Sequence, residues 1–192
     1  MLMRMLLPCG VALLALGCGS GEDAPASSAA QADAEQALRE AASEGRDADI
    51  QSLLDQGVEV DAADQDLRTP LMLASFEGHV DTVLLLLNRG ADAARRDAYQ
   101  RPALIYAASG PFPGVAQALL ARGVDVNALD EDGWTALMFA AAEGNVEVVE
   151  TLLDYGADLG VRDSDGDTAL SFARQNGHEA AVRLLERAAA SD

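Results

Sequence analysis

The stretch DGWTALMFAAAEGNVEVVETLLDYG, residues 132–156, carries the signals for two short helices joined by a turn. The Asp-Gly pair at its start is typical of a tight turn, and Thr135 is placed to cap the first helix. Gly144 is expected to end that helix in the left-handed conformation. The second helix presents one apolar face, made of Val146, Val149, Leu152 and Leu153. Two helices this short cannot enclose a core, so the pair is predicted to stack on neighbours of the same kind.

The same pattern recurs every 33 residues, without insertion or deletion between residues 36 and 188. Four columns of identical residues keep this step: Gly57, Gly90, Gly123 and Gly156; Leu38, Leu71, Leu104, Leu137 and Leu170; Ala41, Ala74, Ala107, Ala140 and Ala173; Asp64, Asp97, Asp130 and Asp163. A fixed period of this length indicates a repeat architecture in which each unit contacts its neighbours.

The motif Thr69-Pro70-Leu71-Met72-Leu73-Ala74 resembles the TPLHxA motif of the ankyrin repeat, and Gly78-His79 and Gly90-Ala91-Asp92 continue the resemblance. The fold class it implies is an all-α ankyrin-repeat solenoid of about five 33-residue helix-turn-helix units with short turn or loop fingers. We place the ankyrin repeat domain at 31–192, with repeats at about 31–63, 64–96, 97–129, 130–162 and 163–192. The first and last are less regular, as capping repeats are; for example, Gln36 stands where a capping Thr is expected.

The N-terminus has the features of an export signal. Residues 1–17 combine Arg4 with a short apolar run, as a signal peptide does. Ala15-Leu16-Gly17-Cys18 resembles a bacterial lipobox, which implies lipidation of Cys18, although the family more often has Leu where Ala15 stands. Plain cleavage or an uncleaved anchor are the alternatives. Residues 18–30 would be the lipidated Cys and a flexible tether, rich in Gly, Ser, Ala and Pro. We therefore expect an exported protein, lipid-anchored in the bacterial periplasm or at the outer membrane.

The charge of the chain limits its partners. The formal net charge is -19, and the basic residues are all Arg. Without a basic face a protein neutralises phosphates poorly, so we expect no nucleic-acid partner. An acidic folded part is also repelled by anionic lipid surfaces, so contact with the membrane is expected through the lipid anchor alone.

The residues that could carry catalysis do not form a recognisable constellation. Both cysteines, Cys9 and Cys18, precede the repeats. His79 and His178 occupy the turn between paired helices, where each is expected to bond locally. The acidic loop at 163–167 places Asp163, Asp165 and Asp167 at alternate positions, which could gather oxygen ligands around a cation. It also matches the repeat's own loop, and an EF-hand would have Gly and Glu where Thr168 and Arg174 stand. We therefore predict no enzyme, no cofactor and no metal site, and leave cation binding at this loop open.

The resemblance implies that a partner protein binds the concave face, formed by the finger tips and the exposed side of the first helices. The third unit departs most from the pattern, with Pro102 for the capping Thr, Gln100 for the turn Gly and the turn Pro111-Phe112-Pro113-Gly114. Trp, Tyr and Arg are frequent interface anchors. The candidate partner-binding residues are Phe76, Arg96, Tyr99, Arg101, Glu131, Asp132, Trp134 and Glu143, with Asp66 in the acidic rim. The alternative is drift in a tolerant repeat.

These features predict a non-catalytic scaffold for protein–protein interaction at the bacterial cell envelope. The alternatives are an immunity protein that neutralises a secreted toxin, or an enzyme. The sequence does not identify the partner.

Overall fold

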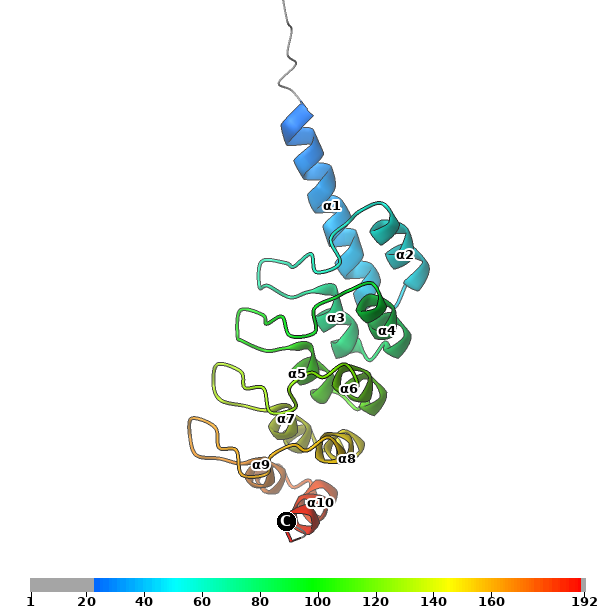
Figure 1. The fold of residues 1–192 in the computed structure, drawn as a ribbon. Helices are drawn as coiled ribbons and strands as arrows, with labels where there is room; N and C mark the ends of the chain where they lie inside the picture. Colours follow the sequence, from blue (N-terminus) through cyan, green and yellow to red (C-terminus); the bar gives the residue numbers. More distant parts are fainter. Residues whose placement is uncertain (1–22, 191–192) are drawn as a thin grey trace, which may run out of the picture.

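The computed structural model describes the backbone of residues 23–190 and the side chains of residues 28–190. This part of the chain contains ten α-helices and no strand, arranged as five consecutive pairs (Figure 1). The pairs are α1 (Asp23–Ser43) with α2 (Asp47–Asp55), α3 (Pro70–Glu77) with α4 (Val80–Asn88), α5 (Ala103–Ala108) with α6 (Pro113–Leu120), α7 (Ala136–Glu143) with α8 (Val146–Asp154), and α9 (Ala169–Gln175) with α10 (Glu179–Ala189).

The pairs stack into an elongated solenoid (Figure 1). The first helices of the pairs (α1, α3, α5, α7 and α9) form an inner row, and their partners form an outer row beside it. Between successive pairs the chain runs out as a finger, and the fingers project on the side of the inner row away from the outer row. The all-α solenoid that the family resemblance implied is confirmed.

Capping residues begin and end the inner helices at the expected places. Thr69, Thr135 and Thr168 each accept a hydrogen bond from a backbone N–H in the first turn of the helix that follows. Gly78 and Gly144 end α3 and α7 in the left-handed conformation. In the third unit Pro102 gives α5 no side-chain cap, and this inner helix is the shortest.

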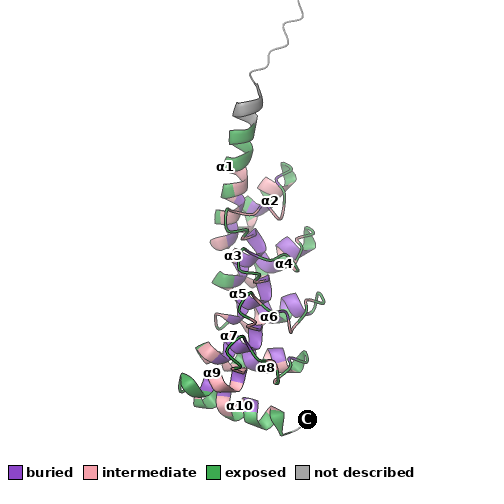
Figure 2. Cartoon of the chain, turned by 90° about the vertical axis from the view of Figure 1, so that its left-hand side faces the viewer, coloured by how far each residue is buried: buried purple, intermediate pink, exposed green. Residues whose placement is uncertain are grey.

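The core lies between the two rows and between neighbouring units (Figure 2). The five alanines of the 33-residue alanine column, Ala41 to Ala173, are fully buried. Their small side chains let neighbouring inner helices approach closely. In the leucine column, Leu38, Leu71, Leu104 and Leu137 are buried, whereas Leu170, in the fifth unit, is half-buried.

The first helix is longer than expected. α1 begins at Asp23 and runs through Gln36, so Gln36 lies inside a helix rather than at a cap position. Residues 23–30, which the sequence led us to expect in a flexible tether over residues 18–30, are therefore helical in the structure. Seven of the residues from 24 to 37 are alanine, the best helix former, and Pro25 lies in the first turn of α1, where proline is tolerated. A helix that is already nucleated in the first unit can therefore extend to Asp23. Residues 18–22 lie outside the described part of the chain.

Candidate protein-binding face

The fingers and the inner helices α3, α5, α7 and α9 together form one surface, which we call the finger face; it corresponds to the expected concave face. Each finger is held by the aspartate of its own unit. One carboxylate oxygen of this aspartate accepts hydrogen bonds from the backbone N–H groups two and four residues later, at 2.7–3.1 Å in all four cases: Asp64, Asp97, Asp130 and Asp163. The repeated aspartate is therefore a structural residue of the finger.

Neighbouring fingers are joined at their tips by backbone hydrogen bonds. The N–H of Ala98 donates to the carbonyl of Asp66 at 2.8 Å, and the N–H of Glu131 donates to that of Tyr99 at 3.1 Å. The next finger continues the series, since the backbone N–H of Ser164 donates to the carbonyl of Asp132 at 3.1 Å. The tips form a ladder across units, which holds their side chains at fixed spacings.

The third finger, residues 96–102, contains a buried polar network; fingers are numbered by the unit whose inner helix they precede. The side chain of Asp97 is fully buried, and the hydroxyl of Tyr106 donates to its Oδ2 at 2.7 Å. Arg101 pairs with the same carboxylate, with Nη2 2.6 Å from Oδ2. Burial alone would raise the pKa of Asp97, but the bonds from Arg101 and Tyr106 lower it below its ordinary value. Burial and the bond to Asp97 raise the pKa of Tyr106 far above its ordinary value. The network is fully paired, so it stiffens the finger.

Two exposed aromatic side chains lie on this network. The guanidinium of Arg101 lies 4.8 Å from the ring centre of Tyr99 and 5.1 Å from that of Tyr106. Phe76 meets Tyr106 edge to face, with ring centres 6.2 Å apart. Phe76 and Tyr99 are each 51% exposed. The structure thus brings Phe76, Tyr99 and Arg101 into one group, with Tyr106 at its centre.

Trp134 belongs to a second ring cluster, one unit further along. Its ring centre lies 5.0 Å from that of Phe139 on α7 and 4.2 Å from that of Phe172 on α9. Trp134 and Phe139 are half-buried, and Phe172 is nearly covered. The residues predicted as a single site therefore fall into two aromatic groups on the same face.

The charged candidates occupy different positions around these groups. Arg96 is exposed, and its Nη1 donates to the backbone carbonyls of Gln100, at 2.9 Å, and Leu129, so it helps to join two fingers. Glu131 and Asp132 are exposed at the tip of the fourth finger, and Glu143 is exposed at the end of α7. Arg96 therefore has a structural role, while the three acids face solvent.

Three residues of the finger face were missed in the sequence: Tyr106, Phe139 and Phe172. They stand 33 residues apart, so they form an aromatic column on successive inner helices, with Leu73 in the same register. The column could have been found in the sequence by comparing the repeats for aromatic residues of any type, rather than for identical residues at each position.

The opposite edge of the solenoid, where each inner helix turns into its outer helix, has a different construction. The expectation that the two histidines bond locally is wrong. The Nε2 of His79 lies 3.0 Å from the carbonyl oxygen of Ser43, and that of His178 lies 2.9 Å from that of Ala142, each in the preceding unit. The turn points each ring back at the unit before it, so these histidines join units.

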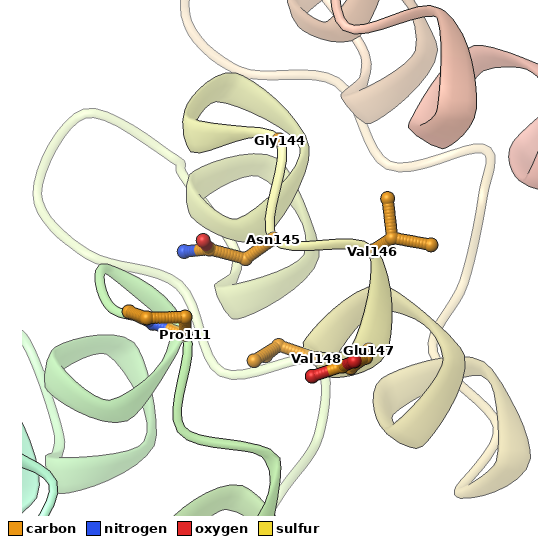
Figure 3. A pocket seen from close by; sticks show the side chains of 6 residues that line it. All are labelled: Pro111, Gly144, Asn145, Val146, Glu147 and Val148. Atoms are coloured by element: carbon orange, nitrogen blue, oxygen red, sulfur yellow. The ribbon is translucent and has the colours of Figure 1, made fainter.

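The third and fourth units modify this edge. Phe112 stands where the histidine is expected, and its ring covers Gly78 and Gly110. In the next unit Asn145 bonds the carbonyl of Ala108 at 3.2 Å instead. A hollow of about 270 Å³ lies beside Asn145, lined by Pro111, Gly144, Val146, Glu147 and Val148 (Figure 3). Glu147 is the one titratable group in its lining, so the hollow has no acid–base pair and contains none of the predicted site residues.

Among the described residues, no group of three or more His, Cys, Asp or Glu side chains is arranged to hold a metal ion. In the acidic loop at 163–167, Asp163 is bonded to the backbone of its own finger. Cys18, the predicted lipidation site, lies outside the described residues. None of the helices in the described part of the chain combines the length and apolarity needed to cross a membrane.

Comparison with known families finds one match. The model described as ankyrin repeats (3 copies) matches residues 4–97, 38–128 and 104–191. No curated protein matches the chain.

Proposed function

Since this chain belongs to the ankyrin-repeat family, we propose that it is a non-catalytic scaffold that binds another protein at the bacterial cell envelope. Ankyrin repeats generally mediate protein–protein interaction. In this proposal the finger face is the binding surface, and a lipid on Cys18 holds the repeats at the membrane. The membrane is contacted through the anchor alone, and nucleic acid is not a partner of a chain with a net charge of -19.

The observation that carries the proposal is the presentation of Phe76 and Tyr99. Both side chains are half exposed although they are large and apolar, and both rest on the buried network of Tyr106, Arg101 and Asp97. Supported aromatic side chains lose little conformational freedom on binding, which is why they are frequent anchors of protein interfaces.

The chemistry of the described residues supports a non-catalytic role. The two histidines bond backbone carbonyls between units, and Asp97 is paired with Arg101 and Tyr106. General acid–base catalysis requires such groups to reach a substrate with a transferable proton. Here the histidines and Asp97 are instead bonded to groups that hold the fold together. Ankyrin-repeat proteins are also typically interaction modules.

The proposal is tested with two pairs of exposed apolar residues. Phe76→Ala/Tyr99→Ala changes the finger face, whereas Leu84→Ala/Tyr155→Ala changes apolar residues of similar exposure, 38% and 41%, outside it on α4 and after α8. The tagged full-length protein is expressed in a bacterium with its own N-terminus, crosslinked and purified. We expect a partner that is captured by the wild type and the α4/α8 pair and lost with the finger-face pair, with helicity by circular dichroism unchanged in both. Equal capture by both pairs would show that the finger face is not the binding surface.

The anchor is tested separately with Cys18→Ala. We expect the wild type to incorporate a labelled fatty acid and to sediment with membranes, and the variant to do neither while it still binds the captured partner in solution. Labelling of the variant would place the lipid elsewhere and contradict the role of Cys18.

A further inference from the structure

The finger face changes its charge halfway along the solenoid. The second and third fingers, residues 63–69 and 96–102, contain three carboxylates and three arginines. The fourth and fifth fingers, residues 129–135 and 162–168, contain six carboxylates and one arginine. The fingers of the second and third units (the neutral half) therefore carry no net charge, whereas those of the fourth and fifth units (the acidic half) are strongly negative. The inner helices add one exposed carboxylate to each half, Glu77 and Glu143.

Two of the three arginines of the neutral half pair with a carboxylate of their own finger, whereas Arg96 bonds backbone carbonyls of two fingers. Nε of Arg68 lies 2.8 Å from Oδ2 of Asp64, and Arg101 pairs with Asp97. In the acidic half, Asp130 and Asp163 hold the finger turns, and Nη1 of Arg162 donates to the carbonyl of Gly166 at 2.7 Å, so this arginine pairs with no carboxylate there. Glu131, Asp132 and Asp165 remain exposed at the tips.

A further carboxylate lies at the other end of this half. Glu143 is exposed in the last turn of α7, where the helix dipole adds negative potential. On the next inner helix, α9, Arg174 pairs with Glu186 at 2.6 Å. The acids at the finger tips and at the end of α7 thus enclose the finger face of the fourth and fifth units from two sides.

Between these acids lies the apolar cluster of Trp134, Phe139 and Phe172. Trp134 and Phe139 keep part of their surface exposed. An aromatic floor between carboxylates is the complement of an arginine or lysine side chain, whose stem packs on rings while its charged end meets an acid.

We infer that the fourth and fifth units bind a basic polypeptide segment of the partner, one that carries Arg or Lys beside an apolar side chain. The inference rests on the proposed function and specifies the partner class. An acidic segment would be repelled by the same carboxylates, so the charge of this half both attracts basic segments and discriminates against acidic ones.

A displayed library of random peptides, panned on the full-length protein, tests this specificity. We expect the enriched peptides to contain an excess of Arg and Lys over Asp and Glu, together with an aromatic or aliphatic residue. A synthetic copy of an enriched peptide should bind roughly ten-fold more weakly to Glu131→Gln/Asp132→Asn/Glu143→Gln, because three exposed charge interactions are removed.

The control removes the same number of charges from the outer helix of the same unit. Glu147→Gln/Glu150→Gln/Asp154→Asn changes exposed carboxylates of α8, and we expect it to change the peptide's affinity less than about two-fold, because charges on a remote face are largely screened. Equal weakening by both triple variants would overturn the inference, since attraction would then come from net charge alone. Enrichment of neutral or acidic peptides that bind the finger face would overturn it too, while leaving the proposed function intact. Enrichment of no peptide would count against both.

Discussion

The imidazole of His178 lies against the backbone of Gly144, in the preceding unit. The ring is held there by its contact with the carbonyl of Ala142, at 2.9 Å, and a Cβ added at Gly144 would overlap the ring. Gly45 and His79 repeat the relationship at the first junction, and in the second junction Gly78 lies under Phe112. The glycine at the end of each of these inner helices therefore also packs against a ring from the next unit.

This relationship predicts that Gly144→Ala destabilises the protein more than Gly177→Ala. Both glycines have a left-handed backbone, with φ of 73° and 76°, so both variants incur the left-handed penalty of about 1 kcal/mol. Gly177 has nothing within 4 Å of an added Cβ. We expect Gly144→Ala to lose at least about 1 kcal/mol more in free energy of unfolding, measured in urea. Equal losses of stability would mean that the His178 ring can move aside for a side chain at position 144 at no cost.

Two finger turns are predicted to gain stability from glycine. Leu67 and Gln100 have φ of 62° and 63°, at the positions that Gly133 and Gly166 occupy in the later fingers. Leu67 is 52% exposed, so it contributes little burial. Leu67→Gly should raise the free energy of unfolding by about 0.5 kcal/mol, because the relieved left-handed strain exceeds the flexibility that glycine adds.

Gln65→Gly in the same finger is the matched control, since Gln65 has no positive φ and should lose stability on the same substitution. Denaturant titrations of the two variants give the comparison. A loss of stability in Leu67→Gly would show that its side chain has a packing role that its exposure does not reveal.

The raised pKa of Tyr106 predicts an alkaline loss of stability. A group whose pKa is higher in the folded state favours folding below its unfolded pKa, and this contribution is lost as the pH rises towards the folded value. With an unfolded pKa of about 10, Tyr106 should account for about 1 kcal/mol of stability lost between pH 10 and pH 11.

Tyr106→Phe removes the titrating group and the bond to Asp97. We expect this variant to be less stable than the wild type at pH 8 by about 1 kcal/mol, and the difference to shrink by pH 11. Unfolding titrations of both proteins at the two pH values measure it. A difference that stays constant with pH would mean that Tyr106 ionises as easily folded as unfolded.

The fold was predictable because its signals are local and repeated. Thr135, Gly144 and the leucine column each indicate the same position for the inner helix of a unit. In the structure this helix begins after Thr135 and ends at Gly144, as they predict. The helix over residues 23–30 was missed because its composition suits both a helix and a tether, and the choice depends on α1 being nucleated further along.

The candidate site was predictable in part. Exposure of Phe76 and Tyr99 follows from their register positions, and both are on the surface. The grouping of Trp134 with Phe172 was not visible, because it depends on how a finger lies across the next unit, 38 positions away in the chain. The bond from His178 to Ala142 was missed for the same reason, since local sequence does not show which unit a turn faces.

The stacking of units predicts that the same substitution has different effects in the middle and at the end of the solenoid. Leu137 and Leu170 occupy one register position, but Leu137 is 1% exposed between two neighbours, whereas Leu170 is half-buried in the last unit. Leu137→Ala should lower the free energy of unfolding by about 2–5 kcal/mol, because it leaves a cavity between packed units. Leu170→Ala should lose less than half as much, since solvent reaches part of the site and α9 can relax. Calorimetry of both variants compares them directly, and equal losses would indicate that the last unit is as tightly packed as the fourth.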